Sequence, residues 1–367
     1  MTVVHRWLAE PPPRDVQQAL ARLATAPAVQ HVAVMPDVHL AEHVCIGTVV
    51  GTTDRLYPQA VGGDIGCGIA TVALTATAAV LADDGAAERV FEALREHVPS
   101  LRQRRRRELD AFGLSDWALD RSVHRDLQFE LGTLGRGNHF LEVQADDEDR
   151  LWLMVHSGSR ALGPAVRDHH LARGQPVGKG LVALPTAGHG RDYLHDHDVA
   201  VWFARQNRRA IAEAAAVALH GALGVAVAWD TWQDVVHNFV RCERHGDGDL
   251  WVHRKGAASA AAGEFGAIPG SMGSWSFHVQ GRGCASSLCS SSHGAGRRLP
   301  RGEAMRRISS REFERQLGGV HFPRELVEAL RDEAPGAYKD IGAVMRAQRD
   351  LVKVVRRLRP VLAWKGA

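Results

Sequence analysis

The stretch Asp64-Ile65-Gly66-Cys67-Gly68 constrains this chain more than any other part of the sequence. It places a carboxylate and a thiol three residues apart, and the glycines allow the backbone to turn tightly there. Both side chains can then reach one cation, the carboxylate as a hard ligand and the thiolate as a soft one. A glycine-rich turn around a buried cysteine explains the same residues equally well, so the interpretation depends on histidines elsewhere.

Four histidines lie beside predicted turns rather than on the faces of predicted helices. They are His139, His156, His237 and His293. Taken singly, each is more often a hydrogen-bonded structural residue than a ligand, although neutral imidazole is the commonest metal donor. Together with Asp64 and Cys67 they indicate a metal centre. Zinc, manganese and iron all suit such a mixed donor set, and the ligand types do not choose among them.

Three loops rich in serine and glycine offer the groups that hold phosphate. They are Ser157-Gly158-Ser159-Arg160, Gly270-Ser271-Met272-Gly273-Ser274 and Ser292-His293-Gly294-Ala295-Gly296-Arg297. Hydroxyls, free backbone N–H groups and guanidinium groups are typical of phosphate cradles. One such loop alone would be interpreted as a surface turn, whereas three of them favour a phosphate-bearing substrate.

The composition is that of an ordinary globular protein, with 45% hydrophobic and 24% charged residues. A formal net charge of +3 is too small to indicate nucleic acid by itself. Five scattered cysteines without a CxxC pair fit free thiols in a reducing compartment. With no apolar signal core near the start and no long apolar run, we expect a cytoplasmic protein.

Several enzyme classes are excluded by missing motifs. The sequence contains neither the GxxxxGK[ST] loop of P-loop NTPases nor the GxGxxG fingerprint of dinucleotide-binding enzymes. It also lacks the HExxH motif of zinc proteases and the HxE and PCxxC pattern of deaminases. The metal and phosphate chemistry therefore belongs to another class.

Apolar periodicity predicts strands and helices without a regular βαβ rhythm. Strands are predicted at 31–38, 46–53, 68–74, 141–143, 151–155, 250–253 and 275–280. Helices are predicted at 15–24, 86–97, 197–223, 322–333 and 337–358, with Pro360 ending the last one. No repeat, linker or boundary interrupts the chain, so we expect one large α+β domain over residues 1–367.

The motifs, taken in order, resemble the RtcB family of RNA-splicing ligases. The matching segments include Pro36-Asp37-Val38-His39, residues 61–68, Gly137-Asn138-His139-Phe140-Leu141-Glu142, residues 156–160, His237-Asn238-Phe239-Val240, residues 253–257, Pro269-Gly270-Ser271-Met272-Gly273, residues 292–297, Tyr338-Lys339-Asp340-Ile341 and Lys365-Gly366. The resemblance runs from about residue 31 to the end, and nine or more ordered motifs make it specific. It implies an RtcB-like fold with mixed sheets around a central metal cleft.

The resemblance also implies an activity. The family joins an RNA 3′-phosphate or 2′,3′-cyclic phosphate end to a 5′-hydroxyl end, using GTP and Mn(II), through a histidine-GMP intermediate. It is active in tRNA splicing or RNA repair. This chain is short for the family, which favours a repair paralogue. The sequence leaves open the physiological RNA, the oligomeric state and the need for an archease-like activator.

Roles carried over by position from the family fall into three sets. Two metal ions would be held by Asp64, Cys67, His139, His156 and His237, with Cys67 bridging. His293 would be the nucleophile that accepts GMP. Tyr338 would stack on guanine; Glu142, Ser276 and Lys365 would bind its edge; Asn138, Ser271, Ala295 and Gly296 would contact phosphate and ribose.

Some residues depart from the family pattern or have an open role. Leu40-Ala41-Glu42-His43 replaces a glycine-containing loop, and Arg136 stands where a glycine is usual, which puts an extra cation near the nucleotide. The arginines within Arg102–Arg107 fit either RNA contact or a solvated surface. Asp37 and His39 fit either the metal site itself or a supporting role behind it.

Two other functions use the same residues. A metal-dependent cyclic phosphodiesterase would open cyclic phosphates without GTP and without joining ends. A non-ligating paralogue would bind RNA ends only, and the intact ligand residues argue against it.

Overall fold

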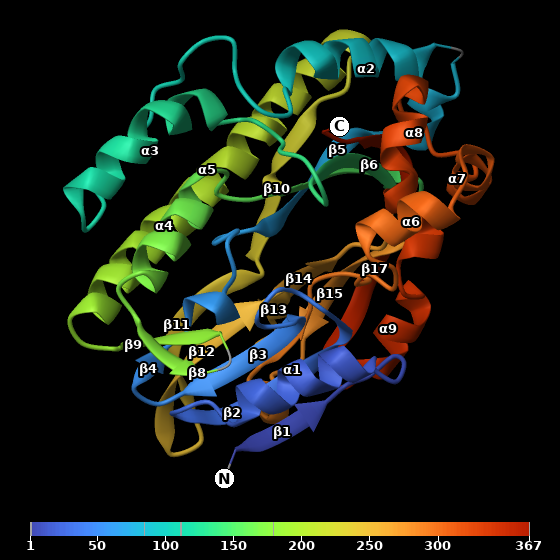
Figure 1. The fold of residues 1–367 in the computed structure, drawn as a ribbon. Helices are drawn as coiled ribbons and strands as arrows, with labels where there is room; N and C mark the ends of the chain where they lie inside the picture. The colour runs from blue at the N-terminus through green and yellow to red at the C-terminus, as the bar shows by residue number, and fades with distance from the viewer. Residues whose placement is uncertain (1, 84, 111, 179, 367) are drawn as a thin grey trace.

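The computed structural model describes residues 2–83, 85–110, 112–178 and 180–366. The larger of its two main sheets has seven strands (Figure 1). Each pair of neighbouring strands in this sheet is antiparallel. In spatial order the strands are β10 (Val227–Val236), β5 (Gly68–Thr77), β7 (Arg150–Ser157), β6 (Phe140–Asp146), β17 (Val352–Trp364), β15 (Ser276–Gly281) and β14 (Phe265–Ile268).

The other main sheet is mixed and has five strands. Its order is β1 (Val3–Arg6), β2 (Val29–His39), β3 (Ile46–Thr52), β12 (Gly248–Lys255) and β11 (Asn238–His245). Only the β1–β2 pair is parallel among the pairings of this sheet. Two small sheets join β13 (Ala257–Ser259) to β16 (Ser290–Ser292), and β4 (Arg55–Leu56) to β9 (Leu181–Pro185) and β8 (Gln175–Gly178).

The helix α5 (His189–Leu223) runs along the seven-stranded sheet and carries much of its core (Figure 1). Its alanine-rich face and α2 (Ala86–His97) share one apolar cluster with residues of β5, β6 and β7. In α1 (Arg14–Ala24), the apolar residues Val16, Ala19, Leu20 and Leu23 recur at helical spacing, and all are buried against the mixed sheet. No described helix is long and apolar enough to cross a membrane.

Shorter elements complete the fold. The other helices are α3 (Trp117–Glu130), α4 (Leu162–Leu171), α6 (Arg301–Arg307), α7 (Ser310–Leu317), α8 (Val327–Leu330) and α9 (Ile341–Ala347). The 3₁₀ turns are η1 (Pro58–Ala60), η2 (Ala78–Leu81), η3 (Ala285–Ser287), η4 (Arg324–Leu326), η5 (Arg331–Glu333) and η6 (Pro335–Ala337).

The α+β class is confirmed, and the structure corrects the predicted helices of the C-terminal quarter. The segment 322–333 is broken into η4, α8 and η5. Of 337–358, only α9 is α-helical; Ala337 ends η6, and β17 begins at Val352. Pro360 does not end a helix but lies inside β17, where the register with β6 shifts between Pro360 and Leu362. A proline is tolerated at such an irregularity because no regular ladder hydrogen bond is lost.

Candidate metal centre and nucleotide pocket

Four strands of the large sheet end side by side, and this register gathers the predicted ligands. Gly68 pairs with both Ser157 and Val236, while His156 pairs with Phe140. The residues just outside these strand ends therefore become neighbours, although they are up to 170 positions apart in the sequence. They are Cys67, His139 and His237, and they join His156 at the end of β7.

The turn that holds Asp64 and Cys67 packs directly on α5. Gly66 has φ +78°, and a Cβ atom on it would lie 2.8 Å from the Cα of Val201 and 2.9 Å from the Cβ of Ala204. Only glycine suits both the backbone angle and this close approach. The prediction of a tight turn is thus confirmed at Gly66, and the turn aims its two side chains away from the helix at the histidines.

The donor atoms form two groups that share one sulfur. Cys67, His156 and His237 offer ligand atoms within 4.8 Å of one another, and so do Asp64, Cys67 and His139. The Cys67 Sγ lies 3.2 Å from His156 Nε2 and 3.6 Å from His139 Nε2. Asp64 Oδ2 lies 2.9 Å from His139 Nε2. The mixed set of oxygen, nitrogen and sulfur donors is suited to one or two divalent transition-metal ions.

The protonation of these groups favours cation binding. Burial, with the neighbouring imidazoles, lowers the pKa of both His156 and His237 well below the ordinary value. Both rings are therefore neutral at neutral pH, as ligation requires. His156 Nδ1 donates to the Asn138 carbonyl at 3.0 Å, which leaves the Nε2 lone pair facing Cys67.

Asp64 and Cys67 differ in charge. Burial acts to raise the pKa of Asp64, but the hydrogen bond and charge of His139 hold it at about 2, so this carboxylate is ionised. Burial and the Asp64 charge raise the pKa of the Cys67 thiol well above its ordinary value. Without a cation the thiol is protonated, and a metal ion must displace that proton to bind the sulfur.

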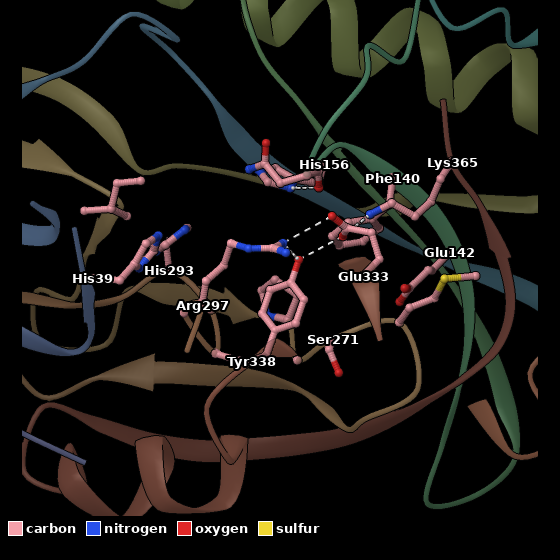
Figure 2. A pocket seen from close by; sticks show the side chains of 18 of the residues that line it. His39, Phe140, Glu142, His156, Ser271, His293, Arg297, Glu333, Tyr338 and Lys365 are labelled. Atoms are coloured by element: carbon pink, nitrogen blue, oxygen red, sulfur yellow. Dashed lines mark hydrogen bonds and ion pairs between the residues drawn. The ribbon is translucent and has the colours of Figure 1, made fainter. Parts of the chain in front are cut away.

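A cavity of about 260 Å³ adjoins this centre through His156 (Figure 2). Its wall brings together most of the residues predicted to bind nucleotide. They are Asn138, Glu142, Ser271, Ala295, Gly296, Tyr338 and Lys365, together with His293. Ser276 is not in this wall, since its hydroxyl lies behind it and accepts hydrogen bonds from Gln144 Nε2 and the Gly270 N–H.

Comparisons with known proteins show which family this chain resembles. The profile of the family described as tRNA-splicing ligase RtcB matches residues 19–124 and 114–366. The RNA-splicing ligase RtcB of Escherichia coli K12 is 37% identical in an alignment that covers 96% of this chain and 94% of that protein. The chain belongs to the RtcB family of RNA ligases.

More distant members match as well. The RNA-splicing ligase RtcB of Mycobacterium tuberculosis is 33% identical over 302 residues, which cover 70% of this chain and 68% of that protein. The tRNA-splicing ligase RtcB of Archaeoglobus fulgidus is 29% identical in an alignment that covers 96% of this chain and 91% of that protein. The family resemblance of the sequence motifs is therefore confirmed.

In this RtcB chain, His293 is oriented by Asp37. The Nδ1 atom of His293 lies 2.7 Å from Asp37 Oδ2, and the Asp37 side chain is completely buried. If Nδ1 carries the proton and donates it, Nε2 keeps its lone pair. His39 lines the same cavity, and burial lowers the pKa of its ring to about 4. Of the two interpretations of Asp37, a supporting role behind His293 fits this geometry.

Glu333 is a central residue of the RtcB pocket that the sequence did not single out. It accepts hydrogen bonds from Lys365 Nζ at 2.6 Å and from the Tyr338 hydroxyl at 2.8 Å (Figure 2). Arg301 and Arg297 also approach it, at 2.6 and 3.3 Å. Burial acts to raise its pKa, but these cations hold the pKa of Glu333 at about 2. An acid at the end of the predicted helix 322–333 carried no signal of this role.

Glu142 faces the same cavity without a salt bridge among the described residues. Its Oε2 accepts a hydrogen bond from Gln144 Nε2 at 2.6 Å. Burial raises the pKa of Glu142 to about 7. A buried carboxyl without a cation partner is suited to a ligand that offers N–H donors.

The remaining sequence features lie around the pocket. Arg136 is exposed and lines a separate hollow with Arg301 and Glu333. The segment Arg102–Arg107 is an irregular stretch between α2 and α3, in which Arg102 covers the Phe129 ring and Arg106 donates to Gln128. Arg104 and Arg105 are exposed. The surface interpretation fits Arg102 and Arg106, and RNA contact stays a prediction.

Proposed function

We propose that this chain joins an RNA 3′-phosphate or 2′,3′-cyclic phosphate end to a 5′-hydroxyl end, using GTP and Mn(II). The observation that carries the proposal is the 2.7 Å contact between the buried Asp37 and His293, because His293 lines a cavity that also adjoins the metal-ligand groups. Tautomer control by a buried carboxylate is the arrangement that activates a histidine nucleophile. Family membership supports RNA as the substrate.

The proposed metal ligands are Asp64, Cys67, His139, His156 and His237. The shared Cys67 sulfur supports two ions with a bridging thiolate, because each ligand group contains this atom. When bound, such ions neutralise phosphate oxygens and make the phosphorus more electrophilic. Manganese is proposed from the family resemblance, since the donor types alone also suit zinc and iron.

For the nucleotide, we assign Tyr338 to stacking on guanine and Glu142, Lys365 and Ser276 to its polar edge. Asn138, Ser271, Ala295 and Gly296 are assigned to phosphate and ribose. The position of all but Ser276 in the cavity wall supports this assignment. One face of the Tyr338 ring is covered by Arg297, whose guanidinium carbon lies 4.8 Å from the ring centre, so guanine would use the other face.

The proposed reaction has three transfers at phosphorus. His293 Nε2 attacks the α-phosphorus of GTP and expels pyrophosphate, while Asp37 holds the Nδ1 proton and stabilises the charge on the ring. A 3′-phosphate oxygen of the RNA then attacks the bound GMP, which frees Nε2 and forms a phosphoanhydride. Finally the 5′-hydroxyl oxygen attacks the RNA phosphate, loses its proton and expels GMP. A cyclic phosphate end is first opened by water.

Covalent labelling with radioactive GTP and Mn(II) tests the nucleophile. Wild type should retain label after denaturation, and His293→Ala should retain none because the attacking nitrogen is gone. The matched control is His220→Ala, an exposed histidine near the end of α5, which should label normally. Normal labelling of His293→Ala would refute the assignment.

A cyclic phosphodiesterase that does not ligate would need the metal ligands but neither GTP nor His293. The 260 Å³ cavity beside His293 favours the ligase instead. Incubation with an RNA that carries a cyclic phosphate separates the two: GTP-independent opening without joined product would support the esterase. Joined product in a single turnover would also exclude a protein that only binds ends. Assays across broken tRNAs and other RNAs then distinguish splicing from repair.

A further inference from the structure

A separate, smaller cavity lies beside the loop that carries Asp64. It measures about 140 Å³, roughly half the volume of the proposed nucleotide pocket. Its wall includes Gly62 and Gly63, which directly precede Asp64, and Lys255, which precedes Gly256. Glu42 and His43 come from the segment that departs from the family pattern, and Arg167 comes from α4. The cavity has room for a single phosphate group rather than for a whole nucleotide.

Two cations converge on this cavity, and the glycines allow their approach. A Cβ atom on Gly62 would lie 3.2 Å from Lys255 Cε, and one on Gly63 would lie 2.5 Å from an Arg167 guanidinium nitrogen. Among the described residues, Lys255 makes neither a hydrogen bond nor an ion pair with its side chain. Burial lowers the pKa of Lys255 to about 8. A partly buried ammonium group without a partner is stabilised by a bound anion.

Two carboxylates, Glu42 and Asp168, share the wall of this cavity with the two cations. The side chains of Glu42 and Asp168 are 79% and 62% exposed, and the partner of Glu42 within 4 Å is His43. Asp168 pairs with Arg167 through Nε, which leaves the terminal nitrogens of that guanidinium without a partner among the described residues. Burial raises the pKa of the nearby Cys45 thiol, so this group is neutral. The wall thus holds two cations and two largely exposed carboxylates, and water screens the carboxylates more than it screens the partly buried Lys255.

The cavity is tied to the reaction centre through Asn238. This side chain donates to the Asp64 carbonyl at 3.0 Å and accepts from the Gly256 N–H at 2.7 Å. A Cβ atom on Gly256 would lie 3.0 Å from the His293 ring. Hence Lys255 is one residue from the backbone that packs against the proposed nucleophile. An anion held here would therefore contact residues that lie next to Asp64 and Gly256 in the chain, rather than a remote surface.

We propose that this cavity binds a backbone phosphate of the RNA, with Lys255 and Arg167 as its cations and Glu42 as a competing charge. This inference extends the proposed ligase function, and it rests on that function for taking the ligand to be RNA. Guanidinium and ammonium groups are the usual partners of phosphodiesters. Free phosphate and the phosphates of GTP share this chemistry, so the experiment separates them from RNA.

The test measures binding of a fluorescent RNA with a 3′-phosphate end, without GTP, between about 50 and 200 mM salt. Arg167→Ala should weaken binding about five- to twentyfold and reduce the salt slope of log affinity by about one. Arg167→Lys should restore most of the loss. Glu42→Gln should act in the opposite direction and tighten binding about two- to fivefold. The matched control is Arg349→Ala, an exposed arginine beyond α9.

The outcomes separate this inference from the ligase proposal. Arg167→Ala should label with GTP as wild type does, because Arg167 is outside the nucleotide pocket. RNA binding equal to that of Arg349→Ala would overturn the RNA site. If Arg167→Ala needs more GTP for labelling but binds RNA as wild type does, the RNA site would also be refuted. The cavity would then bind free phosphate or a phosphate of the nucleotide. Absence of labelling in wild type would instead refute the ligase function. The RNA affinities of the variants would still show whether this cavity binds RNA.

Discussion

At the scale of single residues, the pocket contains a carboxyl group that lowers the stability of the ligand-free protein. Glu142 has its pKa raised by burial from 4.5 to about 7. Between these pH values the folded chain keeps a proton that the unfolded chain has released. Stability therefore falls as pH rises through this window, by about 3 kcal/mol in total. Such a cost is understandable where a residue serves a ligand rather than the fold.

Glu142→Gln should remove this cost. We expect the variant to be more stable than wild type by up to about 3 kcal/mol above pH 7, and equally stable near pH 4.5. Its binding of GTP should weaken, because an amide accepts fewer hydrogen bonds than a carboxylate. Urea unfolding at several pH values and calorimetric titration with GTP measure both effects. Glu96→Gln, on the exposed face of α2, is the control, and equal stabilities at pH 8 would contradict the prediction.

Cys67 gives a second prediction at this scale. Since burial raises the pKa of its thiol, metal binding must release that proton. We expect metal affinity to rise with pH by about tenfold per unit, with close to one proton released for the cysteine. Titration calorimetry in two buffers of different ionisation enthalpy counts the protons. Cys67→Ala should keep its fold but lose metal binding and GMP transfer; unchanged metal stoichiometry would contradict a bridging thiolate.

At the scale of elements, α5 holds the ligand-bearing strand ends in place. Arg208 is completely buried and pairs with Asp234 of β10 at 2.6 and 2.9 Å. Its Nη1 also donates to the carbonyls of Gly66 and Ser157, which adjoin Cys67 and His156. The preceding residue, Asn207, donates to the Ser157 hydroxyl and the Gly158 carbonyl. One turn of this helix thus fixes the spacing of two proposed metal ligands.

The Arg208→Lys variant tests whether the planar guanidinium group is needed in addition to its positive charge. Lysine keeps the positive charge but cannot bridge Asp234 and both carbonyls in one plane. We expect metal affinity to fall about 10- to 100-fold, as for other residues that orient ligands from behind. Arg209→Lys is the matched control, because this neighbour pairs with Glu213 on the helix surface. Equal metal affinities of the two variants in calorimetry would argue against the positioning role.

At the scale of the whole molecule, the C-terminal strand closes the nucleotide pocket. The strand β17 joins β6 to β15 in the centre of the large sheet and delivers Lys365 to Glu333. Glu333 also receives Tyr338 and two arginines, so distant parts of the chain meet at one buried carboxylate. Because its pKa is held at about 2 against an ordinary 4.5, it stabilises the fold above pH 4.5. This stabilisation is lost as pH falls toward 2.

Glu333→Gln should therefore destabilise the molecule at pH 7 by about 3 to 5 kcal/mol, because it leaves the Lys365 charge buried without a partner. The difference from wild type should shrink between pH 4.5 and 2. Chemical unfolding across this range measures it, with the exposed Glu328→Gln on α8 as control. A constant difference down to pH 2 would show that the charge of Glu333 is not the source.

Much of the local structure was predictable from the sequence. The valine-rich run 31–38 lies within β2, the run 46–53 extends one residue beyond the end of β3, and the predicted helix 197–223 lies within α5. The wrong helix at 337–358 shows where local pattern fails. Residues 352–358 mix basic residues with β-branched valines, a pattern that suits either structure, and pairing with β15 and β6 decides for the strand. That residues 1–367 form one domain remains a prediction.

The sequence by itself determined the chemistry available to this protein: a carboxylate and a thiol on a glycine turn, histidines beside strand ends, and loops rich in serine and glycine. Their order along the chain identified the family. Only the tertiary structure decided which of these groups meet, because the alignment of strand ends depends on sheet register between segments far apart in sequence. It also assigned Asp37 to His293 and revealed Glu333, Arg208 and the Lys255–Arg167 cavity, since burial and charge pairing arise only when distant segments pack together.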